Sequence, residues 1–469
     1  MTDQYDVIVI GAGPGGEVLA GRCGDSGLAT AVVERELVGG ECAFWGCMPS
    51  KGLLRPGDVI AAARRVPGAR EAASGEIDTG AALSRRDWIT NNWDDKYQAK
   101  WLENHGADLV RGVGRLDGER TVAVEGEDGS TRRLTARRAV VIATGSTAAI
   151  PPIEGLRDIR IWDNRDATAV KKVPRRLLVL GGGAVGVEMA QALRVLGSQE
   201  VVVIEAMDRL LPMEEPFTGD ELRAAFEAQG IEVVTGARMV AAHRDGNNGQ
   251  VTATLEDGRR LTGDEILVAV GRRPRTQDVG LETVGLEPGR FIEVDDNLTA
   301  TGVDGGWLYA IGDASGRALL THMAKYHGRC VADHILGRAD GGGAEHGAIP
   351  RIIFTDPQIA AVGLTQKQAV DMGIEARSVT SDLSDVAGAK VTGEGVRGKI
   401  QIVVDKARDV IVGATFTGPD VGDMLHGATI AIVGEVPLRR LAHAVPSFPS
   451  LSEVWLKLLE NYEQIEEDQ

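Results

Sequence analysis

The feature that most constrains this chain is a glycine pattern that occurs twice, each time between a strand-like run and a helix-like run. The first copy lies in residues 5–23, YDVIVIGAGPGGEVLAGRC, and contains Gly11, Gly13 and Gly16. In this context the first glycine permits a tight turn, the second lets the backbone approach a pyrophosphate, and the third allows close helix packing. The next strand-like run, ATAVVE, ends in Glu34, where a carboxylate can accept a ribose hydroxyl. These residues therefore predict a dinucleotide site.

The second copy lies in residues 176–205 and repeats the same order of strand, glycines, helix and acid. Its glycines are Gly181, Gly183 and Gly186, and the run VVVIE ends in Glu205. Because the strand before, the helix after and the distant acid all accompany the glycines, the pattern is much more specific than glycines alone. Two nucleotide sites in one α/β chain are therefore predicted.

The acid of the second copy bears on the choice of nucleotide. A carboxylate at Glu205 would bond a free ribose 2′-hydroxyl and repel a 2′-phosphate, which favours NADH over NADPH. Arg209 follows four residues later and could reach a 2′-phosphate, so NADPH stays an alternative.

A cysteine pair follows the first fingerprint in the segment GGECAFWGCMPSK, residues 39–51, at Cys42 and Cys47. The chain has only four cysteines, and the other two, Cys23 and Cys330, lie alone in helical patterns where they are expected to act as small hydrophobes. The pair is typical of a redox disulfide beside a flavin. A zinc site is disfavoured because no second C-x-x-C pair or histidine cluster accompanies it, so no metal is expected.

The charge and the hydrophobic runs of the chain limit the classes of binding partner and the cellular compartment that we expect. A formal charge of −17 argues against nucleic acid or an anionic membrane as a partner, since phosphate binding relies on Lys and Arg. No run approaches the ~18 apolar residues needed to cross a bilayer, and the first strand leaves no room for a secretory leader. We therefore expect a reducing cytoplasm, where a disulfide is more often catalytic than structural.

Together these motifs resemble the flavoprotein pyridine nucleotide-disulfide oxidoreductase family over essentially the whole chain, with dihydrolipoyl dehydrogenase the most similar member. The resemblance also includes ATG at 143–145, the GRRP box, IGDA at 311–314 and PRIIFTDPQIAAVGLT at 350–365. It implies FAD at the first fingerprint and NAD(P)H at the second. The cofactor-binding residues that it implies are Gly11, Gly13, Gly16, Glu34, Gly40, Thr144, Gly145, Gly181, Gly183, Gly186, Glu205, Gly271, Gly312 and Asp313.

The resemblance further implies catalytic roles. Cys47 would be the thiol against the flavin and Cys42 the thiol that meets a disulfide substrate. Lys51 would lie near the flavin ring, paired with Glu188. Glu453 is a candidate from the C-terminal segment, where in the family a glutamate orients a histidine.

The implied architecture is α/β, with two Rossmann-like dinucleotide-binding domains and a C-terminal α+β dimerisation domain. We expect FAD binding in 1–152, NAD(P) binding in 153–275, a central part of the FAD domain in 276–345, and dimerisation in 346–469. A homodimer is implied by the family, because the C-terminal domain completes the active site of the other subunit.

One segment departs from the family pattern. Members that reduce disulfides end in a His-x-His-Pro-Thr-x-x-Glu segment, whose second histidine is the acid and base. Here the matching residues read PSFPSLSE, so that histidine falls on Phe448, and His443 is five residues out of register. Phe cannot move a proton, and a positioned acid–base group is typically worth about 10²- to 10⁴-fold. Glu453 remains without an imidazole to orient.

The sequence therefore favours electron transfer to quinone-like acceptors, which need no acid–base group beside the disulfide. A disulfide reductase, such as dihydrolipoyl dehydrogenase, with a different base is the runner-up, and an NADH-linked redox sensor is a third reading. An aromatic in place of the histidine also resembles soluble transhydrogenase, but that enzyme lacks one of the two cysteines. Mercuric reductase is disfavoured because the C-terminus, NYEQIEEDQ, has no cysteine pair.

Overall fold

The first fingerprint folds as strand, turn, helix and strand in the computed structural model, which describes residues 3–247, 249–338 and 345–467. Strand β1 (Asp3–Ile10) pairs in parallel with β2 (Thr30–Glu34), and helix α1 (Pro14–Asp25) connects them. β1 is a strand because its β-branched residues fill a buried sheet position, with Val7, Ile8 and Val9 fully buried.

The chain forms two units, which are described separately. The first unit comprises 1–49, 86–149 and 271–346, and the second comprises 50–85, 150–270 and 347–469. Helices α3 (Cys47–Arg64) and α5 (Thr79–Ile89) each run across a boundary between these segments. The α/β fold class expected from the sequence is confirmed, whereas the proposed division into four segments stays a prediction.

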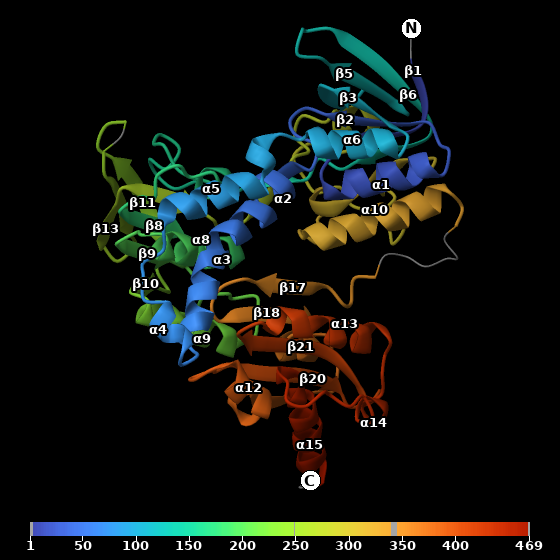
Figure 1. Cartoon of the computed structure of the whole chain (residues 1–469). Coiled ribbons are helices and arrows are strands. Elements are labelled where there is room, and N and C mark those ends of the chain that lie inside the picture. The colour runs from blue at the N-terminus through green and yellow to red at the C-terminus, as the bar shows by residue number, and fades with distance from the viewer. Residues whose placement is uncertain (1–2, 248, 339–344, 468–469) are drawn as a thin grey trace. The chain divides into compact units, whose positions relative to one another are not determined.

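The first unit is built on a mainly parallel sheet with the strand order β3-β2-β1-β6-β5-β4, and a further strand, β16, pairs with β6 (Figure 1). β4 and β5 form an antiparallel extension along β6. Its remaining elements are α2 (Gly40–Phe44), α6 (Lys96–Asn104), β3 (Ala107–Arg111), β4 (Val113–Leu116), β5 (Thr121–Glu125), β6 (Thr131–Ile142), β7 (Ser146–Ala148), β15 (Arg272–Pro274), β16 (Leu308–Ala310) and α10 (Thr321–Ile335).

Helices α1 and α10 lie side by side in the first unit, as Figure 1 shows. Two glycines allow the close approach: a Cβ on Gly15 would lie 2.8 Å from the carbonyl oxygen of Ala324, and one on Gly328 would lie 2.5 Å from that of Gly15. This close approach packs α10 directly against the fingerprint helix α1.

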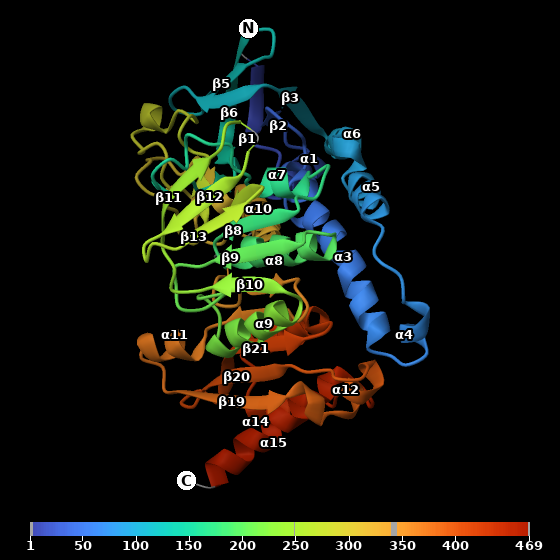
Figure 2. The ribbon, with the colours of Figure 1, turned by 90° about the vertical axis from the view of Figure 1, so that its left-hand side faces the viewer.

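The second unit contains the second fingerprint in a parallel sheet with the order β10-β9-β8-β14 (Figure 2). An antiparallel sheet, β11-β12-β13, belongs to the same region. The elements are α4 (Ala69–Ala72), α7 (Asn164–Thr168), β8 (Arg176–Leu180), α8 (Ala184–Val195), β9 (Glu200–Ile204), α9 (Pro216–Ala228), β10 (Ile231–Val234), β11 (Met239–Arg244), β12 (Val251–Leu255), β13 (Arg260–Gly263) and β14 (Glu265–Val268).

The C-terminal part of the second unit is an antiparallel sheet with the order β17-β18-β21-β20-β19, packed with helices. Every residue of its strand β21 is buried, which explains the apolar run of the sequence there. The elements are β17 (Pro350–Ile353), β18 (Gln358–Gly363), α11 (Gln366–Asp371), β19 (Ala376–Asp382), α12 (Ala387–Thr392), β20 (Lys399–Asp405), β21 (Val410–Gly418), α13 (Leu425–Val433), α14 (Leu438–Leu441) and α15 (Val454–Glu467).

Among the described residues, no helix is both long enough and apolar enough to cross a membrane.

Candidate active site

The glycines of the first fingerprint leave room where a ligand would approach and none where the backbone packs. Gly11 has a φ of +105°, and a Cβ there would lie 2.5 Å from the carbonyl oxygen of Ala143. A Cβ on Gly16 would lie 2.1 Å from the carbonyl oxygen of Gly11. Gly13 has open space where its Cβ would be, at the N-terminus of α1. This open helix end suits a pyrophosphate, because the N–H groups there point at it.

Glu34 is held against this turn by two backbone donors. Its Oε2 accepts from the N–H of Ala12 at 2.7 Å, and its Oε1 accepts from the N–H of Glu36 at 2.7 Å. Each carboxylate oxygen has a second lone pair, so a ribose hydroxyl can still be bound. Gly40 lies close to the fingerprint, since a Cβ on it would be 3.1 Å from the Cα of Gly13.

Thr144 supplies a further sign of a missing partner. Its side-chain hydroxyl is buried and has no hydrogen-bond partner among the described residues. Buried polar atoms are nearly always satisfied, by protein, water or ligand. The open space at Gly13, the second lone pairs of the Glu34 oxygens and this hydroxyl together fit the FAD expected from the sequence.

The second fingerprint reproduces the first almost contact for contact. Gly181 has a φ of +112°, and its Cβ would lie 2.4 Å from the carbonyl oxygen of Ala269. A Cβ on Gly186 would lie 2.0 Å from the carbonyl oxygen of Gly181, while Gly183 again has open space. The repeated geometry supports a second dinucleotide at this turn.

Glu205 takes the place of Glu34 in this copy. Its Oε2 accepts from the N–H of Gly182 at 2.6 Å and its Oε1 from that of Met207 at 2.8 Å. The Arg209 side chain binds within its own loop. Its Nη2 donates to the carbonyl oxygens of Pro212 at 2.9 Å and Glu214 at 3.1 Å. Arg209, the residue that left NADPH as an alternative cofactor, therefore stabilises its own loop.

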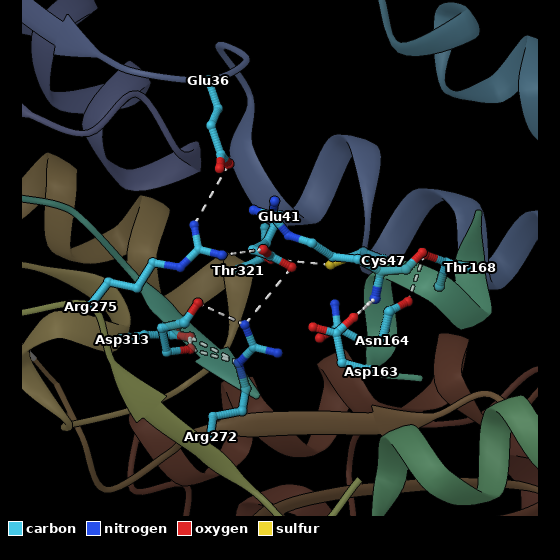
Figure 3. Close-up of polar contacts among 12 residues, drawn as sticks. Glu36, Glu41, Cys47, Asp163, Asn164, Thr168, Arg272, Arg275, Asp313 and Thr321 are labelled. Atoms are coloured by element: carbon cyan, nitrogen blue, oxygen red, sulfur yellow. Dashed lines mark hydrogen bonds and ion pairs between the residues drawn. The ribbon is translucent and has the colours of Figure 1, made fainter. Parts of the chain in front are cut away.

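Asp313 lies in a polar cluster of the first unit (Figure 3). The Ser146 hydroxyl donates to its carboxylate, and Arg272 Nε in turn donates to the Ser146 oxygen at 2.6 Å. Burial raises the pKa of Asp313, which the Ser146 bond and the Arg272 charge partly oppose. Asp313 follows Gly312, whose φ is +60°, at the end of β16. A half-buried carboxylate of this kind can accept hydrogen bonds from hydroxyl groups of a cofactor.

Two arginines of the GRRP region that the sequence did not single out as site residues join this cluster to the cysteine segment. Figure 3 shows Arg275 between Glu36 and Glu41. Its guanidinium lies 2.9 Å from a Glu41 oxygen and 3.8 Å from a Glu36 oxygen, and its N–H donates to the Gly145 carbonyl at 2.9 Å. Gly271, with a φ of +137°, begins this segment. The paired charges keep the GRRP segment beside α2, the helix that carries Cys42.

The two cysteines lie together at α2 and at the start of α3. Cys42 and Cys47 are present as thiols, and the Cys42 thiol is hydrogen-bonded to Cys47. That bond and burial raise the pKa of Cys42, whereas a bond with Thr321 and the charge of Lys325 lower it. Cys47 Sγ lies 3.1 Å from the Thr321 hydroxyl at the first residue of α10. Thr321 was missed from the sequence because nothing local marks it as a partner of a distant thiol.

A carboxyl and a lysine of the first unit, linked to each other electrostatically, were also missed. Burial raises the pKa of Glu17 on α1 from 4.5 to about 7, with Glu34 adding to the rise and the ammonium of Lys325 opposing it. Lys325 follows Thr321 by one helical turn, so both lie on one face of α10. An exposed lysine thus acts electrostatically on both the thiol and the carboxyl. Glu17 could have been noticed, because a carboxylate inside a fingerprint helix is the sort of group that burial perturbs.

Lys51 and Glu188 belong to the second unit and form the expected pair. Lys51 Nζ lies 2.7 Å from Glu188 Oε2, with exposed side-chain fractions of 34% and 7%. The other Glu188 oxygen accepts from the N–H of Phe354 at 3.0 Å, and the ammonium lies 4.7 Å from the centre of the Phe354 ring. The pairing that the resemblance implied is present, and its role toward a flavin stays a prediction.

The C-terminal segment holds no imidazole at the expected position. Phe448 is 77% exposed, and Glu453 accepts from the N–H of Ser450 at 3.3 Å in a capping arrangement at the start of the last helix. Glu453 thus has a local structural bond, and a catalytic part for it stays a prediction.

Two dinucleotide turns, a thiol pair beside the first of them and a Lys–Glu pair define an oxidoreductase that binds two nucleotides and carries a dithiol centre. The chain belongs to the pyridine nucleotide-disulphide oxidoreductase family, which matches residues 5–328, and the dimerisation domain of that family matches residues 349–459. It is therefore an enzyme of the flavoprotein disulfide oxidoreductase class, as the sequence predicted.

Individual relatives agree with this assignment. The chain is 36% identical over 465 residues to dihydrolipoyl dehydrogenase 3 of Pseudomonas aeruginosa, covering 97% of each chain. It is 28% identical to a mercuric reductase of Staphylococcus aureus, covering 96% of this chain and 81% of the relative. Its fold matches the crystal structure of LpdA from Mycobacterium tuberculosis with a TM-score of 0.86 and 26% identity, over 98% of this chain and all of that one.

Proposed function

We propose that the chain is an FAD-dependent NAD(P)H oxidoreductase that uses a Cys42–Cys47 disulfide and passes electrons to a small-molecule, quinone-like acceptor. Bound FAD would accept a hydride from the nicotinamide and supply two electrons to the disulfide or directly to the acceptor. NADH is the preferred donor, because Glu205 faces the turn while Arg209 is bound to its own loop. The enzyme works as a homodimer in a reducing cytoplasm.

The observation that carries the choice of acceptor is Phe448 in place of the usual histidine. The side chain is 77% exposed, so it is free to meet an apolar acceptor or another subunit, but it has no proton to give. A quinone reduced at the flavin needs no proton from the disulfide side. An acceptor disulfide would need one, at a cost of about 10²- to 10⁴-fold when the group is missing.

A second candidate, a disulfide reductase with a different base, is favoured by Glu17 and Lys325. A carboxyl with a pKa of about 7 is half protonated at neutral pH, which is the condition for a general acid and base. Lys325 acts on both this carboxyl and the Cys42 thiol. If Glu17 serves in this way, dihydrolipoamide-type disulfides become accessible to the enzyme.

The test gives purified FAD-loaded protein NADH or NADPH with quinones, lipoamide and small disulfides in parallel. Cys42→Ser is compared with Cys330→Ser, which removes a thiol outside the pair. Quinone turnover that survives Cys42→Ser supports transfer at the flavin, and turnover lost only in Cys42→Ser puts the disulfide on the path. Disulfide turnover that is lower in Glu17→Gln than in wild type supports the second candidate. Failure to turn over any acceptor contradicts both and leaves the redox-sensor reading.

Phe448→His offers a gain-of-function check on the same proposal. If Phe448 stands at the position of the missing base, the variant should raise lipoamide turnover by at least about tenfold, within the range of acid–base catalysis. Unchanged lipoamide turnover in a correctly folded Phe448→His protein contradicts that register.

A further inference from the structure

A strained turn packs beside α2, the helix that carries Cys42, in the first unit. Asn91, Asn92 and Trp93 have φ values of +48°, +53° and +59°, so three consecutive residues other than glycine adopt the left-handed conformation. Such residues are sparsely populated and persist only where surrounding contacts hold them, which makes their location informative.

The contacts that hold the turn end on the helix of Cys42. Trp93 donates its indole N–H to the carbonyl oxygen of Phe44 at 3.1 Å. Phe44 is the last residue of α2, the five-residue helix between Gly40 and Phe44, and its carbonyl is one of those that a helix end leaves without an internal partner. Trp93 therefore fastens the C-terminal end of α2, between Cys42 and Cys47.

A buried arginine contacts the face of the Trp93 indole. Arg86 is fully buried, and its guanidinium carbon lies 5.3 Å from the centre of the Trp93 ring. Its Nε donates to Asp87 at 2.7 Å, so the charge is paired. The partly buried indole thus lies against a buried cation, and this contact favours the ring orientation that reaches Phe44.

The same segment fastens the other end of α2. The N–H of Val38, two residues before the helix begins, donates to Asp95 Oδ2 at 2.7 Å, and Arg111 donates to the same oxygen at 2.6 Å. Residues 93–95 therefore hold α2 at both ends through polar contacts that do not involve the sulfur atoms.

We infer that Trp93 is a positioning residue that fixes α2 so that the Cys42 thiol is held against Cys47. The inference rests on the proposed function, in which these cysteines form a disulfide. Two thiols held in contact form a disulfide more readily than two that move apart, because part of the entropy of joining them is already spent. Releasing α2 should make the disulfide easier to reduce.

The test measures the equilibrium of the cysteine pair with glutathione in the FAD-loaded protein. The Cys42–Cys47 bond breaks, the bond of glutathione disulfide forms, and the protons of two glutathione thiols pass to the two protein thiols. Protein equilibrated at several ratios of reduced to oxidised glutathione is alkylated, and mass spectrometry of the peptide gives the reduced fraction. No nicotinamide or acceptor is needed, so the result is independent of turnover.

Trp93→Phe keeps an aromatic ring over Arg86 but removes the indole N–H, and Trp88→Phe is the matched control because Trp88 is nearby and 74% exposed. We expect Trp93→Phe to raise the equilibrium constant for reduction about three- to tenfold, where tenfold corresponds to about 30 mV. Trp88→Phe should stay within about twofold of wild type. Asp95→Ala, which releases the other end of α2, should shift the constant in the same direction as Trp93→Phe.

Equal constants for Trp93→Phe, Asp95→Ala and wild type overturn the inference while leaving the proposed disulfide intact. If Trp93→Phe does not fold, an unshifted Asp95→Ala overturns it and a raised constant supports it. A wild-type protein whose Cys42 and Cys47 remain open to alkylation after oxidation overturns the proposed function and this inference together.

Discussion

The partly buried carboxyl of Glu17 makes the stability of the protein depend on pH in a direction that can be worked out. Its pKa is about 7 in the folded chain, against 4.5 for an ordinary glutamate, chiefly because burial disfavours the charged form. The folded state therefore binds this proton more tightly than the unfolded state does. Stability that is fully present below pH 4.5 is lost as the pH rises to about 7, and the penalty stays constant above that.

The size of the penalty follows from the same values. A pKa difference from 4.5 to about 7, at about 1.36 kcal/mol for each unit, gives roughly 3 kcal/mol as an upper limit. Glu17→Gln removes the charge and keeps the shape, so at pH 8.5 the variant should be more stable than wild type by up to that amount. At pH 4.5 the two proteins should differ little, because Glu17 is then protonated in the folded state and only half ionised in the unfolded state.

The assay is thermal unfolding of the FAD-loaded protein at pH values from 4.5 to 8.5, with Glu127→Gln as a control because Glu127 is exposed in the same unit. The difference between Glu17→Gln and wild type should grow through the interval from pH 4.5 to 7, and the control should run parallel to wild type. A difference that does not change with pH, or a variant less stable than wild type at pH 8.5, would refute the assignment of a raised pKa.

Further predictions concern the nucleotide and the paired lysine. Glu205→Gln keeps the acceptor for backbone N–H groups but removes the charge, so kcat/KM with NADPH relative to NADH should rise about tenfold; an unchanged ratio would contradict the role of the carboxylate. Arg209→Ala should lower the melting temperature without changing that ratio, because the guanidinium binds carbonyls of its own loop. Lys51→Met leaves a Glu188 oxygen that is mostly buried without its partner and should cost about 1–3 kcal/mol of stability, part of which Lys51→Met/Glu188→Gln recovers, as denaturant unfolding would show.

The parts of the fold that were predictable from the sequence are those fixed by local rules. A buried β-branched strand such as β1, and glycines that carry positive φ, such as Gly11 and Gly181, depend on neighbours within a few residues. The pattern therefore located both dinucleotide turns and the strands around them.

The parts that were not predictable depend on contacts between distant residues. Thr321 meets Cys47 across 274 positions, and Trp93 meets Phe44 across 49, so no local pattern marks either pair. The Arg209 side chain illustrates the same limit: the sequence placed a cation near the ribose, whereas the fold directs it to carbonyls three and five residues along its own chain.

The proposed function requires Cys42 and Cys47 to form a redox centre beside a bound flavin. The most direct measurement is the visible spectrum of the FAD-loaded enzyme after anaerobic addition of two electron equivalents of NADH. A new long-wavelength band from a thiolate next to the oxidised flavin is expected in wild type, and it should be lost in Cys47→Ser but not in Cys330→Ser. Reduction that only bleaches the flavin, with the same spectrum in wild type and Cys47→Ser, would contradict the account.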